Sequence, residues 1–432
     1  KFSHENEEAS AGYYAVDLAR FQIRVELTAT QHAGFYRFTF PESDRSRIQV
    51  DLARRIGMKQ RWLEHSRQYV EILDPQTFQG WMDCPNSDGG WGQGAGGVSY
   101  RLHFFARLSK PMKSWGAWDK HAVSEQVREF EGTNTGFFGE FATSADEQVM
   151  LKVGISLVDV AGAKNNLEQE IPDWDFQGTH QSCRKLWEDV LQLVQFKGGS
   201  EADRTIMATA LYHSFLDPRS IVDVDGRYRA ANGEIRKQKD FQFRTIFSGW
   251  DAFRSHFPLL TIIRPDVIHD EISSWIELAA DTGKDYLPRW EMLHSYSGYM
   301  LSYPAVSVVL DAYQKGIRGY DVERVYELCV NSVEKFGNQP DGYTPNSLSH
   351  TVEYAYTDWC VGRLAELLGK ADDSEKYYRR SLDYKNIWDP SVNWMRAKDE
   401  NGEWIEWLEK TTYGKGCIES NPFQQAWFVP HD

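Results

Sequence analysis

The chain has 432 residues, enough for two or three domains, and its 41% hydrophobic and 26% charged content is typical of a globular protein. It has no apolar run of about 18 residues, so the sequence predicts no membrane span. A formal net charge of −15 argues against nucleic acid as a partner, because neutralising phosphates requires basic stripes that this sequence lacks.

The cysteines and the first residues carry little information about chemistry or location. No C-x-x-C pair occurs, which argues against a zinc or redox site, and we expect most of the cysteines to be small buried residues, among Cys84, Cys183, Cys329, Cys360 and Cys417. The opening stretch KFSHENEEAS is polar and acidic and has no signal-peptide pattern.

Residues 13–160 have the period of β-structure. Apolar and polar side chains alternate along 21–28, which predicts a strand with one buried face. We expect a turn at Gly34, and then further strands at 35–40, 101–109 and 148–158. Several short strands with Gly, Asp and Ser between them predict a β-sandwich over residues 1–162.

The stretch NSDGGWGQGAGG at 86–97 predicts a loop on this sandwich, because so many glycines resist regular structure. It lacks the following helix of a P-loop or dinucleotide fingerprint, which argues against nucleotide binding. With Trp81 and Trp91 it is either a ligand-facing loop or an ordinary surface loop.

The pattern changes to charged and helical over residues 163–199, which predicts a helical linker ending at the Gly198–Gly199 pair. Apolar residues then recur with a period of 3.6 through residues 200–432. We expect helices at 202–215, 266–281, 303–316, 322–336, 349–368 and 373–386. No fixed repeat is visible, so a toroid of helix pairs with a site in its end loops fits better than a solenoid.

Helix-end signals support these limits. Asp321, and either Asp373 or Ser374, are expected N-caps. Gly316 and Gly369 stand where left-handed C-terminal caps are expected.

The loop FSGWDAFRSHFPLL at 247–260 places an aromatic ring, an acid and a base close together. Asp251 either caps a helix and pairs with Arg254, or accepts sugar hydroxyls beside Trp250 as a stacking ring. The proximity of the three residue types favours the binding interpretation slightly.

The segment NSLSHTVEYAYTDWC at 346–360 contains His350 and Glu353, but it lacks H-E-x-x-H and a complete ligand set, which argues against zinc. Ser347 or Ser349 is the expected N-cap of its helix. Glu353, among aromatic residues, is interpreted as a buried structural acid in preference to a site residue.

The last segment, GCIESNPFQQAWFVPHD at 416–432, holds a lone carboxylate, Glu419, among amides and aromatic rings. Such a set suits a site that binds and protonates a neutral polyhydroxylated ligand. A general acid must keep its proton near neutral pH, so Phe423 and Trp427 are expected to form an apolar wall. The bland alternative is a glutamate that braces a loop. No serine or cysteine nucleophile arrangement accompanies it.

Long motifs along the chain resemble glycoside hydrolase family 92, the calcium-dependent exo-acting α-mannosidases. They are SHENEEASAGYYAVDL, QIRVELTATQHAGFYRFTFP, FSGWDAFRSHFPLLTI, DAYQKGIRGYD, HTVEYAYTDWC and ESNPFQQAWFVPHD. The resemblance implies a β-sandwich joined through a helical linker to an (α/α)6 barrel, incomplete here, and inverting hydrolysis of terminal α-linked mannose on glycans.

The same resemblance assigns site residues. Glu419 matches the family's general acid, and Gln424 matches the glutamine of its E-G/S-N-x-x-Q motif, as a ligand or support for Ca²⁺ or the sugar. Trp250 and Asp251 match the W-D pair around the terminal mannose, and Arg254 and Asn421 are expected substrate-binding residues beside them. Calcium is expected to bind two mannose hydroxyls and help to distort the ring.

Departures from the family pattern set limits. Family members carry the general base in a segment after VPHD, so the resemblance implies a base outside this chain, and we predict that the chain alone folds but is inactive. Pro304 and its surroundings differ as well, so the linkage preference does not carry over. The resemblance implies an extracytoplasmic location. Two alternatives remain, namely another (α/α)6 glycoside hydrolase acting on glucosides, and a non-catalytic glycan-binding protein.

Overall fold

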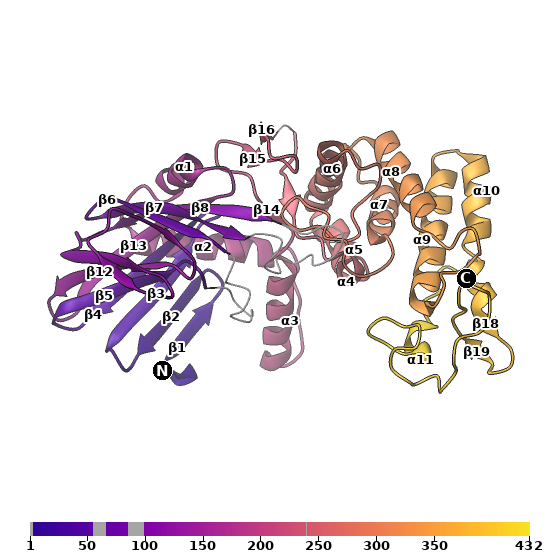
Figure 1. The fold of residues 1–432 in the computed structure, drawn as a ribbon, viewed down its shortest axis with the longest axis horizontal. Helices are drawn as coiled ribbons and strands as arrows, with labels where there is room; N and C mark the ends of the chain where they lie inside the picture. The colour runs from indigo at the N-terminus through magenta and orange to yellow at the C-terminus, as the bar shows by residue number, and fades with distance from the viewer. Residues whose placement is uncertain (1–2, 55–65, 85–98, 239) are drawn as a thin grey trace. The chain divides into compact units, whose positions relative to one another are not determined.

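A computed structural model describes residues 3–54, 66–84, 99–238 and 240–432 of the chain. Its contacts divide these residues into a strand-rich unit that extends to Asp240 and a helical unit that begins at Phe241, with Asp217–Arg219 counted in the helical unit. The expected order, strands first and helices after, is therefore confirmed (Figure 1).

The described residues of the strand-rich unit form two large antiparallel sheets and one two-stranded sheet. Within the described residues the larger sheet has nine strands in the order β1-β2-β3-β4-β13-β8-β7-β6-β11. These are β1 (Glu7–Ser10), β2 (Tyr13–Leu18), β3 (Ile23–Ala29), β4 (Ala33–Phe40), β6 (Gln68–Asp74), β7 (Thr77–Cys84), β8 (Tyr100–Leu108), β11 (Glu129–Gly132) and β13 (Glu147–Ser156). The smaller sheet, in the order β10-β9-β12-β5, comprises β5 (Ser43–Asp51), β9 (Ser114–Trp118), β10 (Val123–Glu125) and β12 (Gly136–Thr143).

The two sheets bury one hydrophobic core between them. Val70 and Phe78 of the larger sheet belong to the same buried cluster as Ile48 and Phe137 of the smaller one. The rings of Phe78 and Phe137 meet across the sheets with centroids 4.6 Å apart. Alternation of apolar residues along each strand supplies these inward faces, as the sequence pattern predicts.

Two of the predictions for this part of the chain concern glycine residues. The turn expected at Gly34 is wrong, because Gly34 lies inside β4, opposite Ala29 and Val153, and the β3–β4 connection is at residues 30–32. Glycine marks a turn only when its backbone needs a positive φ, and here it is a plain strand residue. The glycine-rich stretch at 86–97, with Trp91, lies outside the described residues, whereas Trp81 belongs to β7.

Helices α1 (Val160–Glu170) and α2 (Phe176–Leu191) follow the last strand of the larger sheet. Asp159 caps α1 by accepting from the Gly162 amide at 2.6 Å. Ala163 and Leu167 of α1 and Phe176 of α2 pack with Phe35 and Phe105 of the sheet in a second core. The helical segment predicted at 163–199 is therefore two helices that cover one face of the sheet (Figure 1). The unit continues with α3 (Glu201–Ser214), β15 (Arg227–Arg229) and β16 (Ile235–Lys237).

The helical unit contains the other predicted helices. In chain order it has β17 (Arg244–Thr245), α4 (Gly249–Ala252), α5 (His256–Ile263), α6 (Pro265–Thr282), α7 (Pro304–Gln314), α8 (Val322–Lys335), α9 (Leu348–Leu367), α10 (Ala371–Arg380), β18 (Trp388–Asp389), β19 (Trp394–Met395) and α11 (Pro422–Gln425). The helices expected from the 3.6-residue period match α3, α6, α7, α8, α9 and α10 within a few residues at their ends, although the last expected segment continues from α10 into a short 3-10 turn at Asp383–Ile387.

Helix α9 is buried on several sides. It packs against α7, α8 and α10, and both acids in its middle, Glu353 and Asp358, are fully buried. Ser347 caps it by accepting from the His350 amide, as one of the two expected serines. The N-cap expected at Asp373 or Ser374 is wrong, because α10 begins earlier, at Ala371, and Asp373 accepts from the Tyr326 hydroxyl at 2.5 Å. Asp321 does cap α8.

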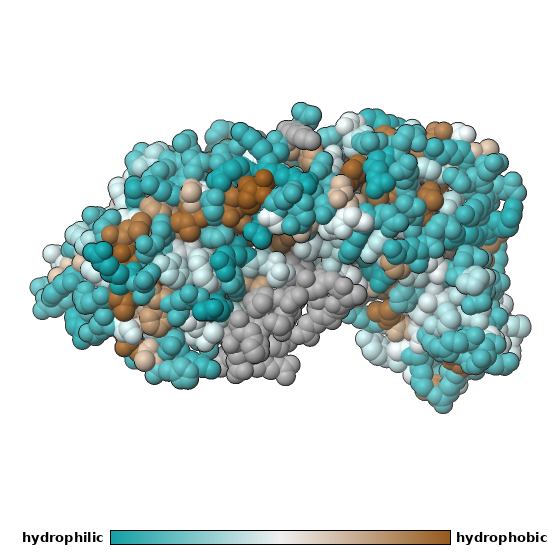
Figure 2. All heavy atoms as spheres, turned by 45° about the horizontal axis from the view of Figure 1, so that its top comes forward, coloured by the Kyte–Doolittle hydropathy of each residue, from teal (hydrophilic) through white to brown (hydrophobic). Residues whose placement is uncertain are grey.

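The surface face drawn in Figure 2 is largely hydrophilic, and its hydrophobic residues form separate patches. Among the described residues, none of the helices combines the length and hydropathy that a membrane crossing requires.

Candidate functional site

The predicted sugar-binding loop at residues 247–260 is largely helical instead, because it contains the short helix α4, a turn and the first residues of α5. Ser248 accepts from the Trp290 indole at 2.9 Å and donates to the Asp251 carboxylate at 2.6 Å. Asp251 is exposed, and it does not pair with Arg254, whose guanidinium turns toward α9 instead. The interpretation that Asp251 caps a helix and pairs with Arg254 is therefore wrong, and Arg254 makes a long-range contact instead.

That contact is with Glu353, in the middle of α9. One carboxylate oxygen, Oε1, accepts from the Trp250 indole Nε1 at 3.1 Å and from the Arg254 Nη2 at 2.7 Å. The side chain is fully buried, and among the described residues its other oxygen, Oε2, has no hydrogen-bond partner of ordinary geometry. Burial raises the pKa of Glu353, while the Arg254 charge opposes that rise.

Arg254 lies between this acid and a set of aromatic rings. Its guanidinium carbon lies 4.5 Å from the centre of the Phe428 ring and 4.6 Å from that of Phe253, and its Nε donates to the Trp250 carbonyl at 3.0 Å. These contacts hold the side chain in one direction although 34% of it is exposed. The loop after α4, α9 and the C-terminal segment therefore meet at Arg254.

The loop that carries Glu419 is attached to the first turn of α9. The carbonyl of Gly416 accepts from the amides of Leu348 and Ser349, and the amide of Ile418 donates to the Ser349 hydroxyl at 3.0 Å. Glu419 itself is exposed and has a left-handed backbone with φ of 51°. A glutamate in that conformation is uncommon and is held there by its surroundings.

Gln425 connects this loop to the rest of the site. Its Oε1 accepts from the hydroxyls of Ser349 at 3.1 Å and Ser420 at 3.2 Å. Gln425 also lies near Glu353, and its side chain opposes the rise that burial causes in the pKa of that carboxyl. Gln425 is 7% exposed, so the connection is internal.

The neighbouring amides play different parts. Asn421 is the N-cap of α11, where its side-chain oxygen accepts from the Gln424 amide at 3.0 Å. The Gln424 side chain is exposed beside it. Phe423 and Trp427 do not enclose Glu419; instead they pack on Trp394, with ring centroids 5.7 and 5.9 Å away.

The geometry brings the two predicted halves of the site to one helix. Ser349 and Glu353 are four residues apart, so they lie one turn apart on the same face of α9. Trp250 and Arg254 attach at Glu353, and Glu419 is held next to Ser349. The sequence pattern does not indicate Ser349 and Gln425 as site residues, and it favours a structural role for Glu353. The position of Glu353 among aromatic residues is the signal that could have indicated a role in the site.

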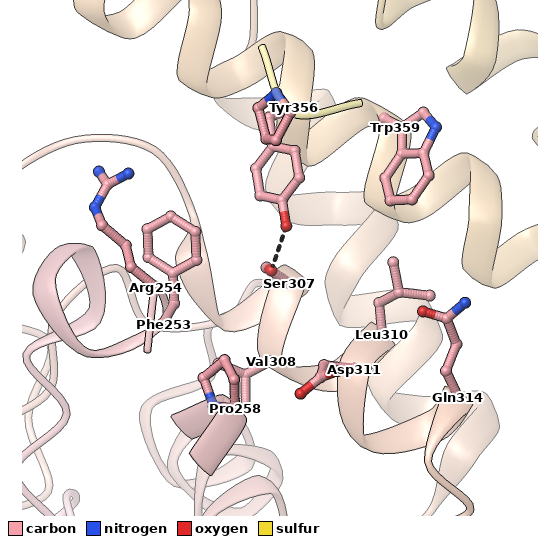
Figure 3. Close-up of a pocket in the computed structure, with 11 residues that line it drawn as sticks. Phe253, Arg254, Pro258, Ser307, Val308, Leu310, Asp311, Gln314, Tyr356 and Trp359 are labelled. Atoms are coloured by element: carbon pink, nitrogen blue, oxygen red, sulfur yellow. Dashed lines mark hydrogen bonds between the residues drawn. The ribbon is translucent and has the colours of Figure 1, made fainter. Parts of the chain in front are cut away.

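A cavity of about 290 Å³ lies next to this cluster, between α5, α7, α9 and the C-terminal segment. Arg254 and Phe253 line one side, and Trp359 and Gln314 the other (Figure 3). Between them the Ser307 hydroxyl and the Tyr356 hydroxyl are hydrogen-bonded at 2.9 Å. The lining combines aromatic faces with hydroxyl, amide and carboxylate groups.

Calcium prefers six to eight oxygen ligands, and the Gln424 amide offers one. In the part of the chain that the structure describes, no group of three or more His, Cys, Asp or Glu is placed to hold a metal ion.

Comparison with known families and structures gives consistent matches. The model of the glycosyl hydrolase family 92 N-terminal domain matches residues 1–156, and that of the family's catalytic domain matches residues 162–432. A family GH92 α-mannosidase from Bacteroides thetaiotaomicron is 29% identical and has a TM-score of 0.91, with 100% of this chain and 58% of that chain covered. That relative has also been solved in complex with mannoimidazole.

Two further relatives are more distant. A family GH92 inverting mannosidase from the same organism is 24% identical with a TM-score of 0.87, with 100% of this chain and 58% of that one covered, which shows a shared fold. An uncharacterized secreted glycosidase from Arthroderma benhamiae is 24% identical over 500 residues, 98% of this chain and 58% of the relative. The chain thus spans a little over half the length of the relatives it matches.

Proposed function

Because the chain belongs to glycosyl hydrolase family 92, we propose that it is part of an inverting, exo-acting α-mannosidase that removes terminal α-linked mannose from glycans. The observation that carries the proposal is the joining of the Trp250 and Glu419 loops on one face of α9. One loop offers an indole and a carboxylate for a sugar, and the other an exposed acid.

Glu419 is proposed as the general acid. An exposed carboxyl on a loop held by Ser349 and Gln425 can approach the glycosidic oxygen of a bound sugar, and its strained backbone fits a residue kept in place for function. In an inverting mechanism the acid protonates the leaving oxygen while a second carboxylate activates water on the opposite face of the ring. Glu419 would be the proton donor of that mechanism.

Trp250 and Asp251 are proposed to bind the terminal mannose, with Arg254 and Asn421 beside them. The Asp251 carboxylate is exposed and is held by Ser248, so it can accept sugar hydroxyls. Arg254 has its charge balanced by Glu353 and lies against aromatic rings, which suits it to forming the wall of the subsite more than to binding an anion. Asn421 uses its oxygen as a helix cap, which leaves its amide N–H groups for a ligand.

Calcium is part of the proposal through Gln424, and a bound cation would supply oxygen coordination of sugar hydroxyls. An extracytoplasmic location is proposed as well, supported by the relative described as a secreted glycosidase.

The helical unit is proposed to belong to an (α/α)6 barrel.

The acid role is tested with the Glu419→Gln variant of the protein expressed from its complete gene. Because the side chain is exposed, we expect unchanged stability and a kcat for an α-mannoside lowered by about 100- to 10,000-fold, the usual contribution of general acid catalysis. Glu409→Gln, an exposed acid in the same region, is the control with expected wild-type activity. A loss of less than about tenfold in Glu419→Gln would refute the assignment.

A further inference from the structure

The carboxylate of Glu353 has a position that its contribution to stability does not explain. Moving a charge into a protein interior costs several kcal/mol, and a buried ion pair often stabilises no more than apolar residues of the same volume would. Glu353 is fully buried, and within the described part of the chain only one of its oxygens makes ordinary hydrogen bonds. An acid in this place is better explained by what it holds.

On one side, Glu353 holds the loop of α4. The Trp250 indole at 3.1 Å and the Arg254 guanidinium at 2.7 Å share its Oε1, although they are about 100 positions away in the sequence. The second bond joins opposite charges in a nearly dry environment, so it fixes direction strongly. The indole ring of Trp250 is thereby oriented by an atom of α9.

On the other side, Glu353 reaches the loop of Glu419. Ser349, one turn before Glu353 on the same face of α9, donates to the Oε1 of Gln425 at 3.1 Å, and the same oxygen accepts from Ser420, the residue after Glu419. Ile418, the residue before Glu419, donates to Ser349, which also donates to Gln425. Both neighbours of Glu419 in the chain are therefore attached to a hydrogen-bond network of Ser349 and Gln425, which adjoins Glu353 on α9.

We propose that Glu353 is the positioning residue of this site, which fixes Trp250 and Arg254 through its Oε1 and lies one turn along α9 from Ser349, to which the Glu419 loop is attached. It touches no reacting atom and acts through these partners. The inference deepens the proposed function and rests on it, since the positions that Glu353 fixes are those assigned to mannose binding.

The test is a double-mutant cycle on the protein expressed from its complete gene, with mannoimidazole binding measured by calorimetry. We expect Glu353→Ala to raise Kd at least about tenfold, because two hydrogen bonds to the sugar-binding loop are lost. Arg254→Ala is expected to raise Kd as well. The double variant is expected to have a Kd only slightly above that of whichever single variant binds less tightly. Effects that simply add would contradict action through Arg254.

A matched control comes from the same helix. Asp358 is also fully buried on α9, but it pairs with Arg380 at 2.9 Å. Asp358→Asn is expected to lower the melting temperature and leave Kd unchanged. If Glu353→Ala lowered the melting temperature while leaving Kd within twofold of the wild type, Glu353 would be a structural acid like Asp358 and the proposal would be overturned.

A second readout does not depend on the ligand. The indole N–H resonance of Trp250, assigned with Trp250→Phe, and the amide resonances of Ile418 to Ser420 are expected to move in Glu353→Ala and to stay in Asp358→Asn. If the wild type bound no mannoimidazole, the mannosidase proposal would fail, and these resonances alone would decide the positioning role.

If the alanine variant does not fold, Glu353→Gln preserves the shape of the side chain. It keeps an acceptor for Trp250 and removes the charge that faces Arg254, so an intermediate rise in Kd and a shifted Trp250 resonance are expected. A Glu353→Gln protein with wild-type Kd and wild-type resonances would overturn the proposal.

Discussion

The role of each residue in this site depends on partners far along the chain. Arg254 follows Asp251 by three positions, a spacing that suggests a local ion pair, yet its partner is Glu353. Glu353 offers Arg254 a buried, charge-assisted bond, whereas Asp251 is exposed to water and already accepts from Ser248. Spacing alone could not reveal this choice, because it depends on where α9 lies.

Asn421 provides a test at this scale. Its side chain caps α11, so Asn421→Ala is expected to lower the free energy of unfolding by about 1 kcal/mol, and Asn421→Asp to restore most of it. Urea denaturation measures both. Gln424→Ala, an exposed neighbour, is the control and should change stability by less than about 0.5 kcal/mol. A cap variant as stable as this control would show that the hydrogen bond at 3.0 Å contributes nothing.

At the scale of the element, sequence patterns predicted type and position well and ends less well. The 3.6-residue period identified α6 and α8 because their buried faces repeat with that spacing. It misplaced the start of α10, since Asp373 resembles a cap but is engaged with Tyr326. The glycine at position 34 also suggested a turn, but Gly34 pairs with Ala29 and Val153 inside a strand. That pairing outweighs the conformational freedom of the glycine backbone.

His350, in the first turn of α9, is expected to make the stability of the protein depend on pH. Burial, with a smaller effect from Arg289, lowers the pKa of His350 from 6.5 to about 4. Between these pH values the unfolded chain binds a proton that the folded protein does not, so stability present above pH 6.5 is lost as the pH falls toward 4. His350 should contribute a loss of up to about 3 kcal/mol, and His350→Gln should reduce it. Unfolding free energies at pH 7 and pH 4.5 measure the difference, and equal losses in both proteins would exclude His350 as the cause.

For the whole molecule, the order of strands and helices could be predicted because each class has its own period. The pairing order that inserts β13 between β4 and β8 could not, since it joins strands more than 100 residues apart. The candidate acid and the W-D pair came from resemblance, and the network that joins them, through Ser349, Glu353 and Gln425, required the fold.

Calcium dependence is a prediction for the protein expressed from its complete gene. We expect EDTA to abolish mannose release from α-1,2-mannobiose and added Ca²⁺ to restore it, while Mg²⁺ does not, because Ca²⁺ accepts more oxygen ligands in a flexible geometry. Activity that is unchanged after chelation would remove calcium from the proposal and leave the acid role of Glu419 untouched.

The most direct test of the central claim compares hydrolysis of 4-nitrophenyl α-D-mannoside and α-D-glucoside by the same protein. The two substrates differ in the orientation of one hydroxyl, and a site built to bond the mannose arrangement should favour the mannoside in kcat/KM by at least about 100-fold. Equal rates, or a preference for the glucoside, would contradict the α-mannosidase assignment.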